Sequence, residues 1–281
     1  MIRAAVIRAA VVQMNSSPDV QRNFVAAAEL IAEAKSQKAE LVVLPECFSC
    51  MCGDLKELGQ KEAQTGGVQS FLSEQAGFHQ LTLVGGTTPI AQNYDGKDSQ
   101  GKNWATCFTY NPSGKQIARY DKIHLFDVDV EDSYGAYRES SDYHHGERVV
   151  ITPTEQVILG FSICYDLRFP ELYRELVRQG AQIITAPSAF THVTGEAHWE
   201  ILVRARAIEN QVFMLAANQC GSHASEGKTN RETWGHSMIV SPAGEVLVEA
   251  GSEPGVFVAD LDLSLQNTVR KTMPCLKHCR V

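Results

Sequence analysis

The sequence lacks long apolar runs, basic runs and a secretion signal, and each absence excludes a class of protein. No segment approaches the roughly 20 uninterrupted apolar residues that a membrane-spanning helix needs, so we expect no membrane-embedded part. No run rich in Lys and Arg occurs, and 33 acidic against 25 basic side chains give a formal net charge of −8. Nucleic-acid binding requires clustered positive charge, so we expect no nucleic-acid partner.

We do not expect the first 14 residues to act as a secretion signal. They are apolar, but Arg3 and Arg8 interrupt them and no small-residue cleavage site follows, unlike a signal peptide. We interpret them as a first strand. Eight cysteines in a chain without such a signal indicate reduced thiols rather than a disulfide framework. The sequence therefore predicts a cytoplasmic protein.

A second CxxC motif is also missing, which bears on metal binding. Cys47, Cys50 and Cys52 resemble half of a metal site, and Cys275 and Cys279 could supply the other half. Structural zinc sites use paired ligand spacings. The spacing therefore favours buried or surface thiols over structural zinc, and we expect no metal ion and no organic cofactor.

Strand-like and helical patterns alternate along the chain, which is typical of an α/β fold. Continuous apolar runs predict strands that are covered on both faces; they lie at 41–46, 81–87, 157–166, 182–189 and 212–219. Hydrophobic residues make up 44% of the chain, enough for a substantial core. No low-complexity linker divides the chain, so we predict a single domain over 1–281, with an exposed loop at 94–102.

Three helices are expected between these strands. The second begins at Pro170, which suits a first helical turn, and ends before Gly180, which suits a carboxyl-terminal cap. The third is expected from about 197 to 209. In the first helix, three- and four-residue spacing makes one apolar face from Phe24, Ala27, Ala28 and Ile31.

Two predicted hairpins, 107–120 and 237–250, interrupt the alternation. Each places Pro and Gly in a tight turn between alternating apolar residues. The same unit of sheet and hairpin is used twice. We therefore expect two similar sheets packed face to face with helices outside.

Three residues at the ends of buried segments are candidates for catalysis. Cys164 ends a strand pattern just before a predicted helix, where backbone N–H groups can stabilise an oxyanion; on position alone, a core cysteine is the commoner explanation. Glu46 ends an apolar strand, so a partly buried carboxylate with a raised pKa, suited to a general base, competes with a capping role. Lys122 follows the first hairpin and could support a thiolate and an oxyanion, although a solvated lysine is the simpler alternative.

Four motifs carry a family resemblance. LPECF, YDKIHLFD, YRES and CYDLRFPE occur in this order between residues 44 and 171. Their order and spacing resemble the Glu, Lys, second Glu and Cys motifs of the nitrilase superfamily of carbon–nitrogen hydrolases.

The resemblance implies a fold, an assembly and a reaction. The fold is a four-layer αββα sandwich, and the assembly is a homodimer or higher homo-oligomer with the tail, about 265–281, at the dimer interface. The implied triad is Glu46, Lys122 and Cys164, with Glu139 orienting Lys122 and the substrate amide. Glu46 takes the thiol proton, Cys164 attacks the carbonyl, and Lys122 with the Tyr165 N–H stabilises the oxyanion.

Residues 188–211, together with NQCGSH and WGHSM further on, resemble the subgroup that includes deaminated glutathione amidase. The resemblance implies hydrolysis of a non-peptide amide to 2-oxoglutarate and cysteinylglycine. Another ω-amidase or a carbamoyl-amine amidohydrolase of the same superfamily is the alternative. One departure is His145, which stands before Gly146 where the motif suggests proline, so the shape of that loop is open.

Further residues are candidates for substrate binding. Phe190, Thr191 and Trp199 follow a strand end and could line an acyl pocket, although aromatic residues at helical spacing are commonly core. Arginines could bind a substrate carboxylate, although pairing with the many acids of this chain is the commoner case; the candidates are Arg168, Arg204 and Arg206. His198 and Glu200 do not have the spacing of an HExxH zinc helix, and His236 is expected to be structural.

Two other classes of protein remain open. In a Cys-His hydrolase, Cys164 would pair with His192, His198 or His236. A non-catalytic binding protein of the same fold is the second alternative, and the presence of all four catalytic residue types argues against it.

Overall fold

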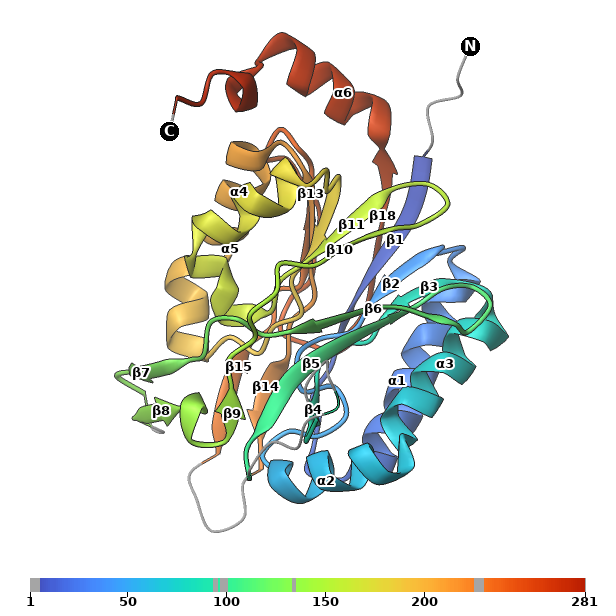
Figure 1. Cartoon of the computed structure of the whole chain (residues 1–281), viewed down its shortest axis with the longest axis vertical. Coiled ribbons are helices and arrows are strands. Elements are labelled where there is room, and N and C mark those ends of the chain that lie inside the picture. Colours follow the sequence, from blue (N-terminus) through green and yellow to red (C-terminus); the bar gives the residue numbers. More distant parts are fainter. Residues whose placement is uncertain (1–5, 93–95, 97–100, 133–134, 225–229, 281) are drawn as a thin grey trace.

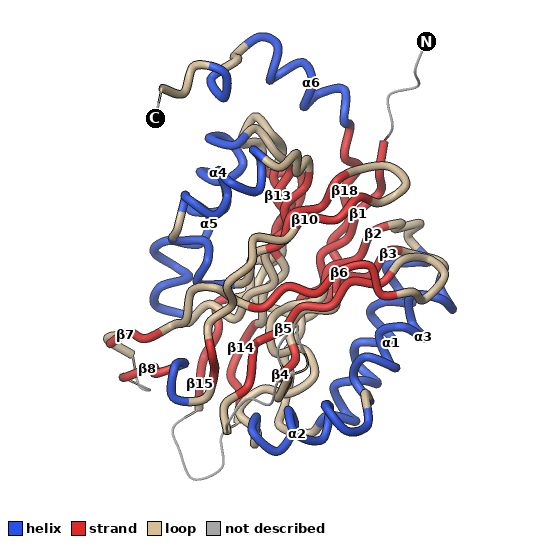
Figure 2. The backbone as a smooth tube through the Cα atoms, in the orientation of Figure 1, coloured by secondary structure: helices blue, strands red, loops and turns tan. Residues whose placement is uncertain are grey.

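The computed structural model describes residues 6–92, 96, 101–132, 135–224 and 230–280. Two β-sheets lie face to face at its centre, and helices cover both outer sides (Figure 1). The four layers are also distinct when the backbone is coloured by secondary structure (Figure 2). The predicted αββα sandwich is confirmed.

The first sheet has eight strands. Its main order is β18-β1-β2-β3-β5-β4, and β6 and β9 also pair with β5. β1, β2 and β3 are parallel, whereas β18 is antiparallel to β1. The strands are β1 (Val6–Gln13), β2 (Leu41–Val43), β3 (Thr82–Val84), β4 (Thr88–Ile90), β5 (Asn103–Tyr110), β6 (Gln116–Asp121), β9 (Tyr143–His144) and β18 (Gly255–Asp262).

The second sheet has six strands in the order β10-β11-β12-β13-β16-β17. Its three central strands are parallel, and the hairpin of β16 and β17 follows at one edge. The strands are β10 (Ile151–Pro153), β11 (Ile158–Phe161), β12 (Ile183–Thr185), β13 (Phe213–Ala216), β16 (Met238–Val240) and β17 (Val246–Glu249). Two small hairpins, β7 (Asp127–Asp129) with β8 (Ala136–Arg138) and β14 (Cys220–His223) with β15 (Arg231–Trp234), lie outside the two sheets.

The alternation of side chains along β1 shows how the layers pack. Ala9 and Val11 belong to the core that includes the second sheet, while Ala10 and Val12 pack with Ile31 of helix α1 (Val20–Ser36). Successive side chains of a strand point to opposite faces, so the middle of β1 has to be apolar on both faces. The four apolar residues between Arg8 and Gln13 have this cause.

The helices divide between the outer faces. α1 and α3 cover the first sheet, α4 and α5 cover the second, and α6 extends from β18 at one end of the molecule (Figure 1). The helices are α1 (Val20–Ser36), α2 (Leu55–Thr65), α3 (Gly67–His79), α4 (Pro170–Arg178), α5 (His192–Asn210) and α6 (Leu263–Thr272), with 3₁₀ turns η1 (Glu139–Ser141), η2 (Cys164–Arg168) and η3 (Cys275–Lys277).

The predicted strands and both hairpins are present, but each of the five strands is shorter than its apolar run, with three or four residues. The run 157–166 is a strand only from Ile158 to Phe161; Ile163 is still extended, and the chain turns at Cys164, which has φ +48°. α5 begins at His192 rather than near 197, because Thr191 Oγ1 caps it by accepting the Thr194 N–H at 3.4 Å. Most of the loop predicted at 94–102 lies outside the described residues.

Among the residues that the structure describes, no helix is both long and apolar enough to cross a bilayer.

Candidate active site

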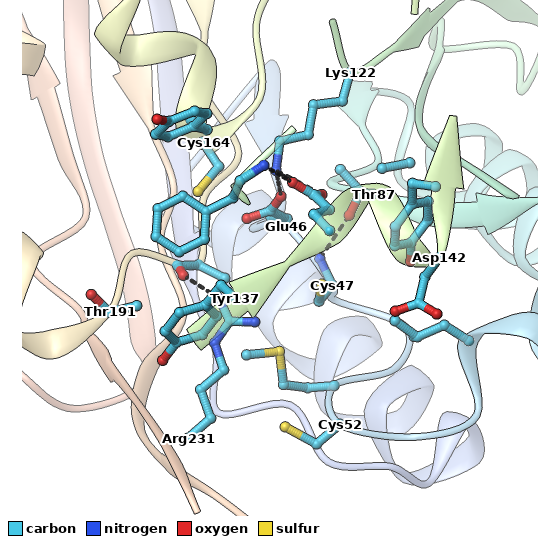
Figure 3. A pocket seen from close by; sticks show the side chains of 18 of the residues that line it. Glu46, Cys47, Cys52, Thr87, Lys122, Tyr137, Asp142, Cys164, Thr191 and Arg231 are labelled. Atoms are coloured by element: carbon cyan, nitrogen blue, oxygen red, sulfur yellow. Dashed lines mark hydrogen bonds and ion pairs between the residues drawn. The ribbon is translucent and has the colours of Figure 1, made fainter. Parts of the chain in front are cut away.

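A cavity of about 400 Å³ lies where strand ends of the two sheets meet, and its lining includes Glu46, Lys122, Glu139 and Cys164. Glu46 follows β2 and Lys122 follows β6 of the first sheet, whereas Cys164 follows β11 of the second. Figure 3 shows these side chains converging on one space. The volume is in the range of small-molecule sites.

Lys122 is the hub of this cluster. Its Nζ lies 2.8 Å from Glu46 Oε1 and 2.9 and 2.8 Å from the two carboxylate oxygens of Glu139. Glu139 is fixed in turn by the Phe126 N–H, which donates to its Oε2 at 2.6 Å. An ammonium group has three N–H donors, so the two carboxylates occupy all of them.

Cys164 lies in a strained turn and is 6% exposed. Its φ of +48° is in the left-handed region, which costs a non-glycine residue on the order of 1 kcal/mol. The Cys164 N–H donates to Pro187 O at 2.9 Å. Glu46 and the backbone of Ala189 lie close enough to the sulfur to shift its pKa, Glu46 upward and Ala189 downward. The turn therefore aims the thiol at the Glu46 carboxylate.

Burial and neighbouring charges set the protonation states of the cluster. Burial raises the pKa of Cys164 above its ordinary value, and Glu46 raises it further, so the resting group is a thiol. Burial alone would lower the pKa of Lys122, but Glu139 and Glu46 outweigh it and the pKa rises, so Lys122 stays charged. A thiol that must lose its proton thus lies beside a carboxylate, Glu46, that can accept it.

The backbone around Glu46 is held from the second half of the chain. Gln219 Nε2 donates to Glu46 O at 2.9 Å and to Ser16 Oγ at 2.8 Å. On the other side, the Cys47 N–H donates to Thr87 Oγ1 at 2.8 Å. These bonds fix the position of a carboxylate that lies outside regular structure.

Two glycines permit close backbone approaches beside the cluster. A Cβ on Gly86 would collide with the carbonyl oxygen of Pro45, and a Cβ on Gly146 would collide with the carbonyl oxygen of Asp121. The Gly146 N–H also donates to Lys122 O at 2.7 Å. The loop in which His145 departs from the motif therefore closes directly on the backbone of Lys122.

Asp166 joins the turn of the nucleophile to the segment that carries Lys122. The carboxylate is fully buried and accepts from Tyr120 OH at 2.7 Å, from His124 N–H at 3.1 Å and from Ile163 N–H at 2.8 Å. Tyr120 and His124 stand two residues on either side of Lys122. One carboxylate thus sets the position of the ammonium relative to the thiol.

Comparison with known proteins agrees with this geometry. The family model for carbon–nitrogen hydrolases matches residues 8–271. The chain belongs to the carbon–nitrogen hydrolase family. It is a hydrolase of carbon–nitrogen bonds other than peptide bonds, and the resemblance to the nitrilase superfamily is confirmed.

Named relatives of this carbon–nitrogen hydrolase cover nearly its whole length. A deaminated glutathione amidase of Synechocystis is 40% identical over 96% of this chain and 97% of its own, and human omega-amidase NIT2 is 36% identical over 97% and 95%. Among solved structures, yeast Nit3, a member of branch 10 of the nitrilase superfamily, has TM-score 0.81 at 32% identity over 96% of this chain and 94% of its own. The C. elegans NitFhit protein has TM-score 0.86 at 34% identity, over 99% of this chain and 66% of that longer one.

The structure separates the predicted substrate-binding residues into two groups. Tyr165, Phe190 and Thr191 line the cavity of the hydrolase. Trp199 does not: it is 1% exposed, its ring meets Phe190 edge to face, and its Nε1 donates to His236 O at 2.6 Å. Trp199 is a core residue that supports the cavity wall.

The arginines proposed for carboxylate binding do not line the cavity. Arg168 lies 5.7 Å from the ring centre of Phe190 and contacts His198 Nδ1 at 3.3 Å. Arg204 donates to Glu200, and Arg206 donates to Glu209 and to Leu167 O. Arg204 and Arg206 therefore form hydrogen bonds and ion pairs within the protein, which is the commoner case expected from the sequence.

The histidines of the rival Cys-His mechanism are also placed elsewhere. His192, His198 and His236 do not belong to the cavity lining. Within the described part of the chain, no group of three or more His, Cys, Asp or Glu side chains could hold a metal ion. Cys47, Cys50 and Cys52 line the cavity, whereas Cys275 and Cys279 are exposed in the tail.

Several lining residues have no signal in the sequence pattern. Thr87, Tyr137, Tyr143 and Arg231 come from four separate segments. Asp166 could have been found, because it stands two residues after Cys164 in the same motif. Arg231 could not, since its importance depends on what surrounds it in space.

Proposed function

We propose that this carbon–nitrogen hydrolase is a deaminated glutathione amidase that uses Cys164, Glu46 and Lys122, supported by Glu139. The observation that carries the proposal is the cavity cluster, in which a thiol lines one space with two carboxylates that share a buried ammonium, and one of these carboxylates, Glu46, raises the pKa of the thiol. The full-length relationship to an amidase of that name supports the substrate. The chemistry of the residues supports the mechanism.

The proposed reaction has two halves. Glu46 accepts the Cys164 proton, the sulfur bonds to the amide carbon, and Lys122 exchanges one Glu139 contact for the oxyanion, which the Tyr165 N–H also stabilises. The C–N bond breaks as Glu46 returns the proton to the amine of cysteinylglycine. Glu46 then activates water, which hydrolyses the thioester to 2-oxoglutarate and the free thiol.

The cavity favours deaminated glutathione over glutathione on charge grounds. The two molecules differ mainly by a keto group in place of an ammonium. Glu46 and Glu139 already bind Lys122, and the third carboxylate of the lining, Asp142, is exposed. An ammonium of glutathione placed near Cys164 would therefore be desolvated without a buried partner. An unpaired charge of this kind costs several kcal/mol, or roughly a hundredfold or more in rate.

The test compares kcat/KM for deaminated glutathione and glutathione, with 2-oxoglutarate release as the measurement for the first and glutamate release for the second. We expect a preference of at least roughly a hundredfold for the deaminated compound. Cys164→Ala is the control and should release neither product. Equal cleavage of the two compounds would refute the substrate assignment.

An ω-amidase is the second candidate, because omega-amidase NIT2 proteins are 36–38% identical over nearly the whole chain. Its test substrate is 2-oxoglutaramate, which has the same acyl group but releases ammonia. A kcat/KM for 2-oxoglutaramate well above that for deaminated glutathione would select this alternative.

We also propose that the enzyme is cytoplasmic and forms a homodimer through its carboxyl-terminal tail. Exposed apolar side chains support a protein–protein interface, since Met273 of the tail is 65% exposed and Ile201 of α5 is 70% exposed. Analytical ultracentrifugation of the full chain and of a chain ending at residue 262 tests the assembly. A monomeric full chain would contradict it.

A further inference from the structure

Three cationic side chains line the cavity, and their partners differ. Lys122 gives its three donors to Glu46 and Glu139. Arg138 is about half exposed and its Nη2 lies 2.6 Å from Asp129 Oδ1. Arg231 has no carboxylate within ion-pair distance among the residues that the structure describes.

Arg231 is nevertheless a constrained side chain. It begins β15, its Nη2 donates to Ala189 O at 2.8 Å, and its guanidinium lies 5.4 Å from the ring centre of Tyr137. Figure 3 shows the side chain reaching into the cavity beside Tyr137. Its Nε is buried and has no acceptor among the described residues.

This arrangement is energetically incomplete. A guanidinium has five N–H donors, and the protein accepts one hydrogen bond from Arg231 through Ala189 O. A buried charged donor without an acceptor costs more than an ordinary lost hydrogen bond. A planar carboxylate is the anion that the guanidinium fork fits best.

Arg231 is also close to the reacting thiol. Arg231, Ala189 and Cys164 line the same cavity, and Arg231 donates to the carbonyl of Ala189. The backbone of Ala189 is also close enough to the Cys164 sulfur to lower its pKa. A carboxylate held by Arg231 therefore lies within a short carbon chain of an amide placed at Cys164. Lys122 cannot serve this purpose, because its donors are needed at the reacting carbonyl.

We propose that Arg231 binds a carboxylate of the substrate and so makes the enzyme selective for ω-amides that carry an acidic group. The inference deepens the proposed function and rests on it, because deaminated glutathione has two carboxylates. The competing explanation is structural, namely that Arg231 only fastens β15 to Ala189.

A matched pair of amides separates these explanations. Glutaramate and pentanamide have five-carbon chains, and only the former ends in a carboxylate. Their Kd values are measured by calorimetry in the Cys164→Ala background, and their kcat/KM values in the active enzyme. Arg231→Gln should weaken glutaramate binding about a hundredfold, mainly through KM in turnover, and change pentanamide less than threefold.

Two variants serve as controls. Arg231→Lys should recover part of the loss, because it keeps the charge without the fork. Arg138→Gln should leave the ratio of glutaramate to pentanamide affinity unchanged, because Arg138 is already paired. Parallel losses for both amides, equal binding of both amides before substitution, or no loss for either would overturn the proposal.

A second experiment identifies which carboxylate of the substrate Arg231 binds. It also distinguishes a wrong role for Arg231 from a wrong proposed function. Deaminated glutathione, its glycine amide and 2-oxoglutaramate are compared in wild type and Arg231→Gln. A loss for all three is expected, because Arg231 is proposed to bind the acyl-side carboxylate. A loss confined to the first would place the interaction at the glycine carboxylate and, like no loss for any, would overturn the proposal. If the wild type hydrolyses no deaminated glutathione, the proposed function fails, while the glutaramate pair still decides the role of Arg231.

Discussion

Lys122 and Arg231 are two cations of one cavity with opposite surroundings. Two carboxylates occupy every donor of Lys122, whereas Arg231 has, within the part of the chain that the structure describes, a single backbone acceptor and a buried Nε without a partner. Neighbours hold the Lys122 ammonium in place before the substrate arrives, so one of its donors has only to exchange a carboxylate oxygen for the oxyanion during the reaction. Buried N–H donors that have no acceptor in the protein need one from the bound substrate.

The difference separates chemistry from selectivity. The region around Lys122 suits any amide whose carbonyl reaches Cys164, because nothing in it addresses the rest of the substrate. The region around Arg231 is proposed to bind a carboxylate of the substrate that is distant from the scissile amide, and it does not contact the reacting atoms. Variants of the two regions should therefore differ in whether their effect depends on the substrate.

The largest effect is expected from the Lys122 region. Lys122→Ala, Cys164→Ala and Glu46→Gln should each lower kcat/KM by at least about a thousandfold for charged and neutral amides alike, because they remove nucleophile, base or oxyanion donor. Double variants should be little worse than single ones, since the residues act as a unit.

Thermal unfolding provides the control for these variants, because Lys122→Ala leaves two carboxylates without their ammonium. A folded Lys122→Ala enzyme that retains most of its turnover would disprove the triad.

Glu139→Gln should have a smaller effect of about thirtyfold to a hundredfold on kcat, with KM nearly unchanged. The amide can still accept one hydrogen bond from Lys122, but it lacks the charge that holds the ammonium. The change makes Lys122 more like Arg231, with a donor that is not fixed. A variant that raises KM for acidic amides alone would show that Glu139 acts on selectivity instead.

Asp166→Asn should lower kcat about tenfold, in equal proportion for acidic and neutral amides. Asn cannot accept from Tyr120, His124 and Ile163 without directing its own N–H at one of them. The Lys122 segment would shift relative to Cys164. Steady-state kinetics on glutaramate and pentanamide measures the loss of kcat. An unchanged kcat would show that the hydrogen bonds of Asp166 do not position the Lys122 ammonium.

The sequence predicts the Lys122 region better than the Arg231 region, for a physical reason. Glu46 and Cys164 end apolar runs, and strand ends of a layered α/β fold meet at one edge, so pattern and motif together indicate the cluster. The apolar runs and the two hairpins likewise predict the sandwich. Helix α2 has no such signal, because its buried residues are Gly59 and Glu62.

Arg231 illustrates what a pattern does not contain. Its role depends on the absence of a nearby carboxylate, which is a property of the folded neighbourhood. Trp199 and Arg168 show the reverse. Trp199 was a candidate for the acyl pocket and Arg168 for binding a carboxylate, but Trp199 is a core residue and Arg168 lies outside the cavity lining. Spacing predicts which elements meet, whereas side-chain partners have to be observed.

The smallest effect on activity is expected at His223, which stands opposite Arg231 in the β14–β15 pairing. His223 is 1% exposed, its Nδ1 contacts Ser16 O at 2.8 Å and its Nε2 contacts Thr233 Oγ1 at 2.7 Å. These partners suit a neutral ring with one donor and one acceptor. Burial lowers the pKa of His223 from 6.5 to about 4.

Because the folded pKa of His223 is depressed, the unfolded chain binds its proton more readily. The free energy of unfolding should therefore be undiminished above pH 6.5 and should fall as pH drops from 6.5 towards 4, by up to about 3 kcal/mol. His223→Gln keeps one donor and one acceptor but does not titrate. Urea unfolding at pH 7 and pH 4.5 should show a smaller loss for this variant than for the wild type, while kcat/KM at pH 7 stays within twofold; the exposed His198→Gln should follow the wild type. Identical losses in all three proteins would show that folding does not lower the pKa of His223.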